Sequence, residues 1–500
     1  MLQPKYQYTF TNAKDLQNYD YHASKVKLID CDGRSGVNLG GIRDALVLPN
    51  HTANEDKGAV SFWMMSMEDL YPAAHHDNHG ESNPHFCNYN IISDNQAGRD
   101  FDSATFLLNY STDWHPVFTG KFFRGNASVG YYCPDGPHAQ ATANYFHFLR
   151  EQWYHILFSW DKENSEYRIY ANGVLVGIED YGEKPLLAHP VAQQLYIGNP
   201  NWVYSEINFY DKLPVPADVK GMYQVHKPAG NDTLDKALAD TYEGVTPKAF
   251  SPGNQDQWQT QLSLPLTETG DLGKFHIQGC TKAPRITADG LMIQTPKHSK
   301  DYFKKIGALA ETHPKKPLPD YRQVYLWSKE TFAGDIHVSY EFKSLAYGGL
   351  SLLMVHASGM QGESFLDDYF ATASGSMRSV CWADIRNYHW EYYRQMHDTR
   401  HDMISHAAMK NPWFRPMGFQ LYPGSWALDR WYRLDYKQEG NRIVCAIDNQ
   451  VVLDMHDDPS DNNGPVFRKG HIAIRCMINS HMLFRNLTVA TKAKYSALEL

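Results

Sequence analysis

The amino-acid sequence repeats one pattern of strands in its two halves, and this repeat limits the possible fold more than any other feature. Trp153-Tyr154 in the first half matches Trp431-Tyr432 in the second half. A turn follows 19 residues later at Asn172-Gly173 and 18 residues later at Asn449-Gln450. Asn-Gly between two apolar runs is a strong hairpin signal. The two halves therefore have the same local order of strand, strand, turn and strand.

Other offsets agree with this repeat. Ile197 and Ile474 both lie 25 residues after the first position of their turn. Gly58 precedes the first tryptophan by 95 residues, and Gly334 precedes the second tryptophan by 97 residues. A ladder reproduced this closely predicts two copies of one unit, each built from short strands. We therefore expect an all-β protein of two tandem antiparallel β-sandwiches of the jelly-roll kind.

Composition divides the chain into three parts. We expect a β-sandwich over residues 1–225, a linker over 226–257, and a second sandwich over 258–500. The middle stretch is polar and contains several Pro and Gly residues, which is typical of a linker. Short helices are predicted near 216–223 and 234–242.

Charge and aromatic content narrow the range of partners. The net charge is −9 without a basic run, which argues against nucleic acid, because phosphates require a positive surface. A local group of Arg can still bind an anionic glycan. The 12 Trp and 32 Tyr suit both a sandwich core and the stacking of rings on sugars. No apolar run is long enough for a membrane-spanning helix.

Cysteine usage and the N-terminus bear on compartment. Seven scattered cysteines without a Cys-x-x-Cys pair indicate neither a disulfide framework nor a zinc site. The first residues lack the charged-then-apolar pattern of a signal peptide. We expect a secreted or periplasmic protein whose signal has been removed, and a cytoplasmic protein is the alternative. The sequence does not indicate an oligomeric state.

One loop between Tyr71 and Cys87 is rich in possible metal ligands. Its ionisable side chains are His75, His76, Asp77, His79, Glu81 and His85. Imidazoles and carboxylates bind transition metals, but this spacing follows no known ligand pattern, and such loops are usually solvated. We therefore predict no metal site here and no required cofactor. A structural calcium ion is compatible with the fold, although no Asp-x-Asp-Gly loop indicates its ligands.

The stretch Arg378–Asp398 carries the chemistry that the sequence offers. Its second half is aromatic and has no Gly or Pro, so it is predicted to be a strand. A period of two places Tyr388, Trp390, Tyr392 and Arg394 on one face, and His389, Glu391, Tyr393 and Gln395 on the other. An imidazole, a carboxylate and a phenol on one face can transfer protons to and from a ligand. The alternative is a structural strand whose polar tips are hydrogen-bonded.

Both halves resemble known families. The run Trp153–Trp160, followed by a strand that ends at Asn172-Gly173, resembles laminin-G domains of the concanavalin-A-like fold. The second half resembles the YesU-like family of concanavalin-like jelly rolls. The residues that carry this resemblance are Leu352–Ala357, His389–Arg394 and Trp431–Leu434. The resemblance implies a role in the breakdown of plant or algal polysaccharides, with the active groove in the second sandwich.

It also implies which residues act there. The catalytic candidates are His356, His389, Glu391, Tyr393 and Arg394, and the substrate-binding candidates are Trp382, Arg386, Tyr392, Trp413 and Arg415. In a β-elimination on a uronic-acid polymer, His389 or His356 would be the base and Tyr393 the acid. Arg394 or Arg386 would neutralise the carboxylate. Strict alternation places Arg394 opposite His389, so this assignment requires a β-bulge.

Two further functions fit the same groove. A glycoside hydrolase needs two carboxyl groups, and Glu391 with Asp384 or Asp367 would supply them. A carbohydrate-binding protein would need no catalytic group. In all three cases the partner is a polysaccharide or oligosaccharide.

Overall fold

The computed structural model describes most of the chain. The described residues are 2–10, 12, 20–22, 26–39, 45–68, 88–95, 104–111, 117–122, 140–164, 166–180, 190–198, 202–279, 282–296, 323–366, 385–395, 403–412, 415–459, 464–477 and 479–492. They form two compact units, Met1–Glu243 and Gly244–Leu500. The described helices are too short or too polar to cross a membrane.

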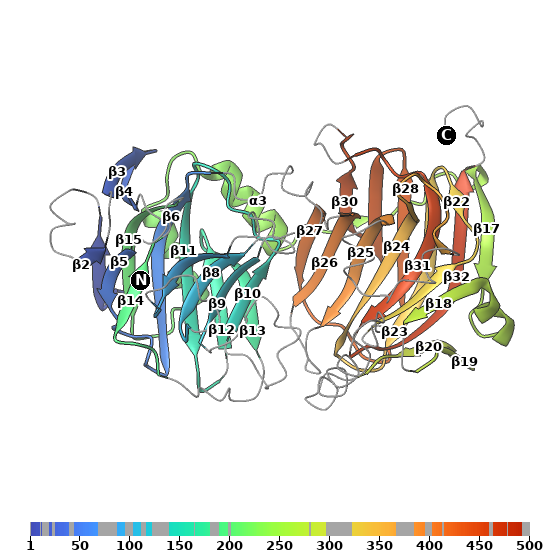
Figure 1. Cartoon of the computed structure of the whole chain (residues 1–500), viewed down its shortest axis with the longest axis horizontal. Coiled ribbons are helices and arrows are strands. Elements are labelled where there is room, and N and C mark those ends of the chain that lie inside the picture. The colour runs from blue at the N-terminus through green and yellow to red at the C-terminus, as the bar shows by residue number, and fades with distance from the viewer. Residues whose placement is uncertain are drawn as a thin grey trace, which may run out of the picture. The chain divides into compact units, whose positions relative to one another are not determined.

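The first unit is a sandwich of two antiparallel sheets (Figure 1). Its strands are β1 (Tyr6–Thr9), β2 (Asp20–His22), β3 (Val26–Cys31), β4 (Arg34–Leu39), β5 (Ala45–Pro49), β6 (Lys57–Ser66), β7 (Asn88–Ser93), β8 (Leu107–Ser111), β9 (Val117–Lys121), β10 (Gln140–Asn144), β11 (Trp153–Asp161), β12 (Glu166–Ala171), β13 (Val174–Asp180), β14 (Gln194–Ile197) and β15 (Trp202–Tyr210). One sheet has the order β13-β12-β11-β6-β15-β4-β3, with β1 also paired to β15. The other has the order β10-β9-β8-β7-β14-β5-β2.

The second unit is also a sandwich. Its strands are β16 (Lys248–Ala249), β17 (Trp258–Leu264), β18 (Phe275–Gly279), β19 (Arg285–Thr287), β20 (Gly290–Gln294), β21 (Gln323–Ser328), β22 (Phe332–Ala333), β23 (Ile336–Ser344), β24 (Gly349–Gly359), β25 (Ile385–Gln395), β26 (Met403–Asn411), β27 (Arg415–Pro423), β28 (Tyr432–Glu439), β29 (Arg442–Ile447), β30 (Gln450–His456), β31 (Lys469–Met477) and β32 (His481–Lys492), with short 3-10 helices η2 (Gln255–Gln257) and η3 (Thr269–Lys274). One sheet has the order β16-β30-β29-β28-β23-β32-β20-β19, with β17 on β32. The other has the order β18-β21-β31-β24-β25-β26-β27, with β22 on β31.

The two units repeat each other strand for strand. The order β13-β12-β11-β6-β15-β4-β3 matches β30-β29-β28-β23-β32-β20-β19, and β10-β9-β8-β7-β14-β5-β2 matches β27-β26-β25-β24-β31-β21-β18. Trp153 opens β11, and Trp431 directly precedes the equivalent strand β28. The predicted repeat and the all-β sandwich fold are therefore confirmed.

The hairpin turns lie at equivalent places in the two units. Asn172 and Gly173 join β12 to β13 with φ values of 51° and 82°. In the second unit the turn residues are Asp448 and Asn449, with φ values of 48° and 62°. Two-residue hairpins favour positive φ at both positions, because that twist matches the twist of the strands. The first turn prediction is confirmed, and the second was one residue too late, since Gln450 already opens β30.

Two helices cover part of the first unit. α2 (Pro216–Val225) starts on Pro216, which is favoured at the first helical position, and buries Val219, Met222 and Tyr223. These side chains pack against the outer face of the sheet that contains β6 and β11. α3 (Asp232–Tyr242) lies within the stretch expected as a linker and packs with the first unit, against β13. The division between the units follows Glu243.

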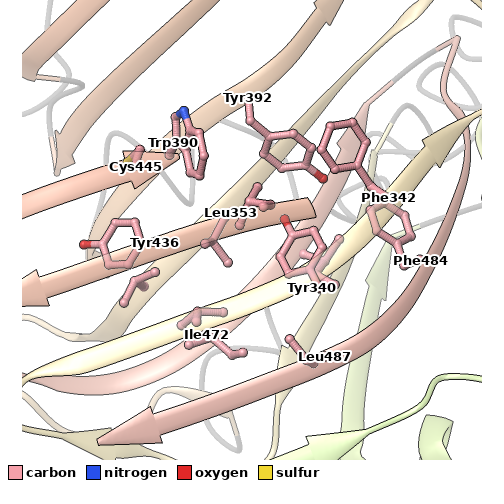
Figure 2. Packing of buried hydrophobic residues seen from close by; sticks show 14 of the residues in the cluster. Tyr340, Phe342, Leu353, Trp390, Tyr392, Tyr436, Cys445, Ile472, Phe484 and Leu487 are labelled. Atoms are coloured by element: carbon pink, nitrogen blue, oxygen red, sulfur yellow. The ribbon is translucent and has the colours of Figure 1, made fainter. Parts of the chain in front are cut away.

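The core of the second unit lies between its two sheets, as Figure 2 shows. Side chains of one sheet, such as Tyr340 and Phe342, meet Leu353, Trp390 and Tyr392 of the other. Each fully buried large apolar side chain contributes roughly 1.5–3 kcal/mol. This packing fixes which side chains of β25 point inward and therefore which point away from the core.

Candidate functional site

The candidate site lies on the outer face of the sheet that contains β24, β25 and β31, which are neighbours in this sheet (Figure 1). On β25, Trp390 belongs to the core between the sheets. Its neighbours His389 and Glu391 therefore point to the outer face, because side chains alternate along a strand. They pair with Met354 and Leu352 of β24. This part of the sequence prediction is confirmed.

A β-bulge then changes the alternation on β25. Glu391 pairs with Leu352 while Tyr393 pairs with Ser351, so Tyr392 is an extra residue between them. A bulge of this kind lets two successive side chains point to the same face. The side chains of Tyr392 and Tyr393 are both in the core cluster. Arg394 thereby joins the outer face, where its Nη1 donates a hydrogen bond to Glu391 Oε2 at 2.6 Å.

The predicted position of Tyr393 was wrong for this reason. Its ring centroid lies 5.4 Å from that of Trp426 inside the core. Its hydroxyl donates to the backbone carbonyls of Tyr347 at 2.8 Å and Ala346 at 3.1 Å. The structure does not bring this phenol together with His389, so the phenol does not serve as an acid beside it.

The expectation that Tyr392 binds substrate is also wrong. Its side chain belongs to the core between the two sheets, where its ring centroid lies 4.8 Å from that of Phe342 and 5.7 Å from that of Trp390. Burial raises the pKa of the Tyr392 hydroxyl. Its role is to pack the two sheets together.

The surroundings of His389 favour the neutral form of its imidazole. Its side chain is only 1% exposed, and its Nε2 lies 3.5 Å from Glu391 Oε1. Burial lowers the pKa of His389, the carboxylate of Glu391 opposes this effect, and the positive charges of Arg475 and Arg394 lower it further. A neutral imidazole can accept a proton from a ligand.

Arg475 of β31 completes this group, and the sequence analysis missed it. It pairs with Leu352, which also pairs with Glu391, so these three residues form one row across the sheet. Its side chain is fully buried, and its Nε donates to Gln323 Oε1 at 2.8 Å. Its signal was present in the alternation of His471–Met477, where the apolar residues on either side of Arg475 point to the core. We call His389, Glu391, Arg394 and Arg475 the outer-face cluster.

An aromatic pair lies beside this cluster on β21. The rings of Tyr325 and Trp327 are nearly parallel, at 4°, with centroids 5.6 Å apart. The guanidinium carbon of Arg475 lies 5.0 Å from the Tyr325 ring centroid. Trp327 Nε1 donates to Gln278 Oε1 at 3.0 Å, and Phe365 contacts the Trp327 ring edge-on. The outer face thus combines charged and aromatic side chains.

His356 has a different environment. It lies where a second bulge shifts the register between β24 and β31, and its φ is 53°. Burial lowers the pKa of His356 to about 3 and Arg468 adds to this, while the backbone of Phe332 and Gly334 opposes it. Its surroundings are the chain around β22, so we assign it a structural position.

Arg386 and Arg415 belong to a second polar group, at the end of β25 to β27. It surrounds Lys410, whose Nζ lies 2.7 Å from Asp457 Oδ2 in a buried ion pair. Burial lowers the pKa of Lys410, Asp457 raises it, and the positive charges of Arg415 and Arg386 lower it again. The guanidinium carbon of Arg386 lies 5.8 Å from the Phe467 ring centroid.

Several predicted residues lie outside the described part of the chain. They are Trp382, Trp413, Asp367, Asp384 and the histidine-rich loop at 75–85. Within the described ranges, no group of three or more His, Cys, Asp or Glu side chains is placed to hold a metal ion.

Comparisons with known proteins place the second half in a family. Residues 311–489 match the family described as "Domain of unknown function (DUF1961)". The chain is 26% identical over 174 residues to the uncharacterized protein YesU of Bacillus subtilis (strain 168). The aligned region covers 34% of this chain and 79% of YesU. The second half carries a YesU-like domain. This resemblance is confirmed, whereas the laminin-G resemblance of the first half stays a prediction.

Solved structures similar to the chain include a Bacillus subtilis protein of unknown function with a galectin-like fold. It is 20% identical, with a TM-score of 0.38, over 49% of this chain and all of that chain. The carbohydrate-binding module CBM66 from Bacillus subtilis is 13% identical, with a TM-score of 0.25, over 47% of this chain and 96% of that one. Domain 4 of the extracellular arabinanase AbnA from Geobacillus stearothermophilus, solved with arabinotriose, is 13% identical, with a TM-score of 0.28, over 44% and 97%. At these TM-scores the likenesses carry no argument about the ligand of this chain.

Proposed function

We propose that the second unit acts on an acidic plant or algal polysaccharide at the outer-face cluster and cleaves it by β-elimination. One observation carries this proposal: the imidazole of His389 lies on the same face as the guanidinium groups of Arg394 and Arg475. Guanidinium groups bind carboxylates through a planar pair of N–H donors. A base beside such donors is what proton abstraction next to a carboxylate requires.

The proposed steps use only these side chains. A guanidinium binds the uronate carboxylate and stabilises the negative charge that develops when the adjacent C–H bond breaks. His389 Nε2 or Nδ1 takes that proton, the electron pair forms a C=C bond, and the bond to the glycosidic oxygen breaks. The imidazolium of His389 then gives the proton to the departing oxygen. Because one group accepts and returns the proton, the loss of Tyr393 as an acid does not stop the reaction.

Burial supports a functional role for this cluster. The side chains of His389, Glu391 and Arg475 are 1%, 3% and 0% exposed. Keeping charged groups out of water is costly, and ionisable groups with shifted pKa values gather at functional sites. Low surrounding polarity also strengthens the attraction between a guanidinium and a carboxylate.

The test combines three measurements on acidic glycans such as pectic, alginate-like and ulvan-like polymers. Elimination produces a double bond conjugated to a carboxylate, which absorbs in the ultraviolet. Hydrolysis produces reducing ends without this absorbance, and a binding protein is retained on a glycan column without either product. Reducing ends alone would replace the proposal with a hydrolase, and retention alone would replace it with a binding protein.

Variants identify the base. His389→Gln should lower the elimination rate by a factor of about 10²–10⁴, which is the usual contribution of a general base. The matched control is His456→Ala, because His456 is exposed at the end of β30 on the other sheet, and its rate should not change. An unchanged rate in folded His389→Gln protein would refute the assigned base.

A further inference from the structure

Arg475 lies beside two polar side chains of the neighbouring strand β21. Tyr325 pairs directly with Arg475, and Gln323 pairs with Met477. Val324, which stands between these two residues of β21, belongs to the core. Because side chains alternate along a strand, Gln323 and Tyr325 both point to the outer face, on the same side as Arg475.

The side-chain oxygen of Gln323 accepts hydrogen bonds from three donors. Arg475 Nε donates to it at 2.8 Å, Arg475 Nη2 also donates to it, and the Tyr325 hydroxyl donates to it at 2.8 Å. Since all three partners are donors, they require the carbonyl oxygen and not the amide nitrogen of this side chain. The side chains of Gln323 and Arg475 are buried. Two of the three guanidinium nitrogens are thus fixed to one buried acceptor.

The aromatic pair of β21 restrains the same guanidinium. Its carbon lies 5.0 Å from the ring centroid of Tyr325, and the ring of Trp327 lies nearly parallel to that of Tyr325. A guanidinium is attracted to the face of an aromatic ring, and its planar shape lets one acceptor and one ring fix its orientation. A group that binds a ligand must be held in this way before the ligand arrives.

The acceptor that orients Arg475 is uncharged, unlike the acceptor of Arg394. Arg394 Nη1 donates to the carboxylate of Glu391 at 2.6 Å, and this ion pair balances its charge. The amide of Gln323 orients Arg475 without adding a negative charge, whereas a carboxylate at this position would compete with an acidic ligand. Burial lowers the pKa of His389, and of the two cations Arg475 lowers it more than Arg394 does. The charge of Arg475 therefore acts at the proposed base.

We infer that Gln323 is a positioning residue, which holds the guanidinium of Arg475 so that it binds the carboxylate of the sugar that loses its proton to His389. This inference rests on the proposed function, and it assigns carboxylate binding to Arg475 and leaves Arg394 as the partner of Glu391. The substrate class that follows is a uronate with a free carboxylate, because a methyl ester offers the guanidinium no negative charge.

The binding experiment uses the full chain and two acidic polymers, polygalacturonate and alginate, each with its methyl ester. Affinity gel electrophoresis is run on His389→Gln protein, which lacks the base and leaves the probe intact. Gln323→Leu, added to this protein, removes the acceptor and nearly keeps the size of the side chain. It should weaken binding of the acidic form about tenfold and leave binding of the ester unchanged, because only the acidic form needs the oriented guanidinium.

The turnover experiment repeats the comparison with His389 present. Gln323→Leu should lower kcat/KM for the acidic form about tenfold relative to the ester, since the guanidinium also stabilises the charge that develops in the reaction. Gln323→Glu keeps an acceptor oxygen but adds a negative charge beside Arg475. It should weaken binding of the acidic form at least as much as Gln323→Leu does.

Gln278→Leu is the matched control. Gln278 is a buried glutamine in the same sheet, and its oxygen accepts from Trp327 Nε1 at 3.0 Å instead of from Arg475. Gln278→Leu should lower Tm by an amount similar to that of Gln323→Leu, because each loses one buried acceptor. It should keep the wild-type ratio of acidic to ester binding, which a purely structural loss does not change.

Three results would overturn the inference. The first is the absence of retardation of His389→Gln protein by both acidic polymers. The second is an equal loss of acidic and ester binding in Gln323→Leu, which would leave this residue a structural role alone. The third is unchanged acidic binding in folded Gln323→Leu or Gln323→Glu protein. Failure of the proposed reaction is seen separately, as an absence of ultraviolet product from the wild type while acidic binding still depends on Gln323.

Discussion

Replacing Tyr393 with Phe tests where its hydroxyl lies. Strict alternation predicts that the hydroxyl lies beside His389, whereas the structure places it in the core. If this hydroxyl lay beside His389, its removal would remove an acid and lower turnover by a factor of about 10²–10⁴. The structure instead places it in the core, where it donates to the carbonyls of Tyr347 and Ala346. Tyr393→Phe should therefore lower stability and leave proton transfer intact.

The magnitude follows from these two contacts. Phe retains the ring that packs 5.4 Å from Trp426, so the apolar contribution is kept. The loss is one hydroxyl donor shared between two partly buried carbonyls, which costs about 1–2 kcal/mol of unfolding free energy. For a unit of this size, that corresponds to a fall in Tm of about 2–8 °C.

The assay measures thermal unfolding and elimination rate on the same preparation, with the rate expressed per folded molecule. His389→Gln is the complementary variant, and it should show the opposite pattern, with a large loss of rate and a smaller change in Tm. A hundredfold loss of rate in Tyr393→Phe at unchanged Tm would refute the reasoning, because it would mean that the hydroxyl faces the ligand.

Three further predictions concern stability. Lys410→Met should lower the unfolding free energy of the second unit by about 3–5 kcal/mol in urea unfolding, because it leaves the buried carboxylate of Asp457 without its cation. Adding Asp457→Asn to this variant should recover part of the lost stability. Burial lowers the pKa of His406 to about 3, so the unfolded state binds the proton first, and stability should fall as pH drops from about 6.5 towards 3, by up to about 1.4 kcal/mol per pH unit. His406→Gln should reduce this slope by that amount. Burial alone would raise the pKa of Asp435, but hydrogen bonds from His337 and Arg433 outweigh burial and lower this pKa. The contribution of Asp435 to the unfolding free energy is therefore full above about pH 4 and is lost in acid. Asp435→Asn should remove this loss of stability in acid.

The repeat was predictable because its signals are local. The positions of the tryptophans, the turns and the isoleucines along the sequence indicate the order of the strands, and no long-range contact has to be known. The structure shows the same strand order in both units. The second turn was placed one residue too late because Asp448 also adopts positive φ, which Asn449-Gln450 alone does not reveal. The interval that looked like a linker contains Leu234, Leu238 and Tyr242, whose burial in α3 depends on tertiary packing.

The candidate site was predictable only up to the first irregularity of its strand. His389 and Glu391 follow strict alternation and face away from the core, as predicted. Arg475 comes from a strand more than 80 residues later and reaches Glu391 only through the pairing of β31, β24 and β25. A sequence without pairing information gives no reason to connect these residues, although each one alternates correctly on its own strand.

The bulge at Tyr392 decides the chemistry of the site. Without it, the face would present His389, Glu391 and Tyr393, which are a base, a carboxylate and an acid. With it, the phenol turns into the core and Arg394 takes its place beside Glu391. One extra residue thus exchanges a phenol for a guanidinium on this face, and a guanidinium is the group that the proposed reaction on an acidic glycan needs. Bulges often re-aim side chains at functional sites, and the proposed function of this strand depends on the point where the period of two fails.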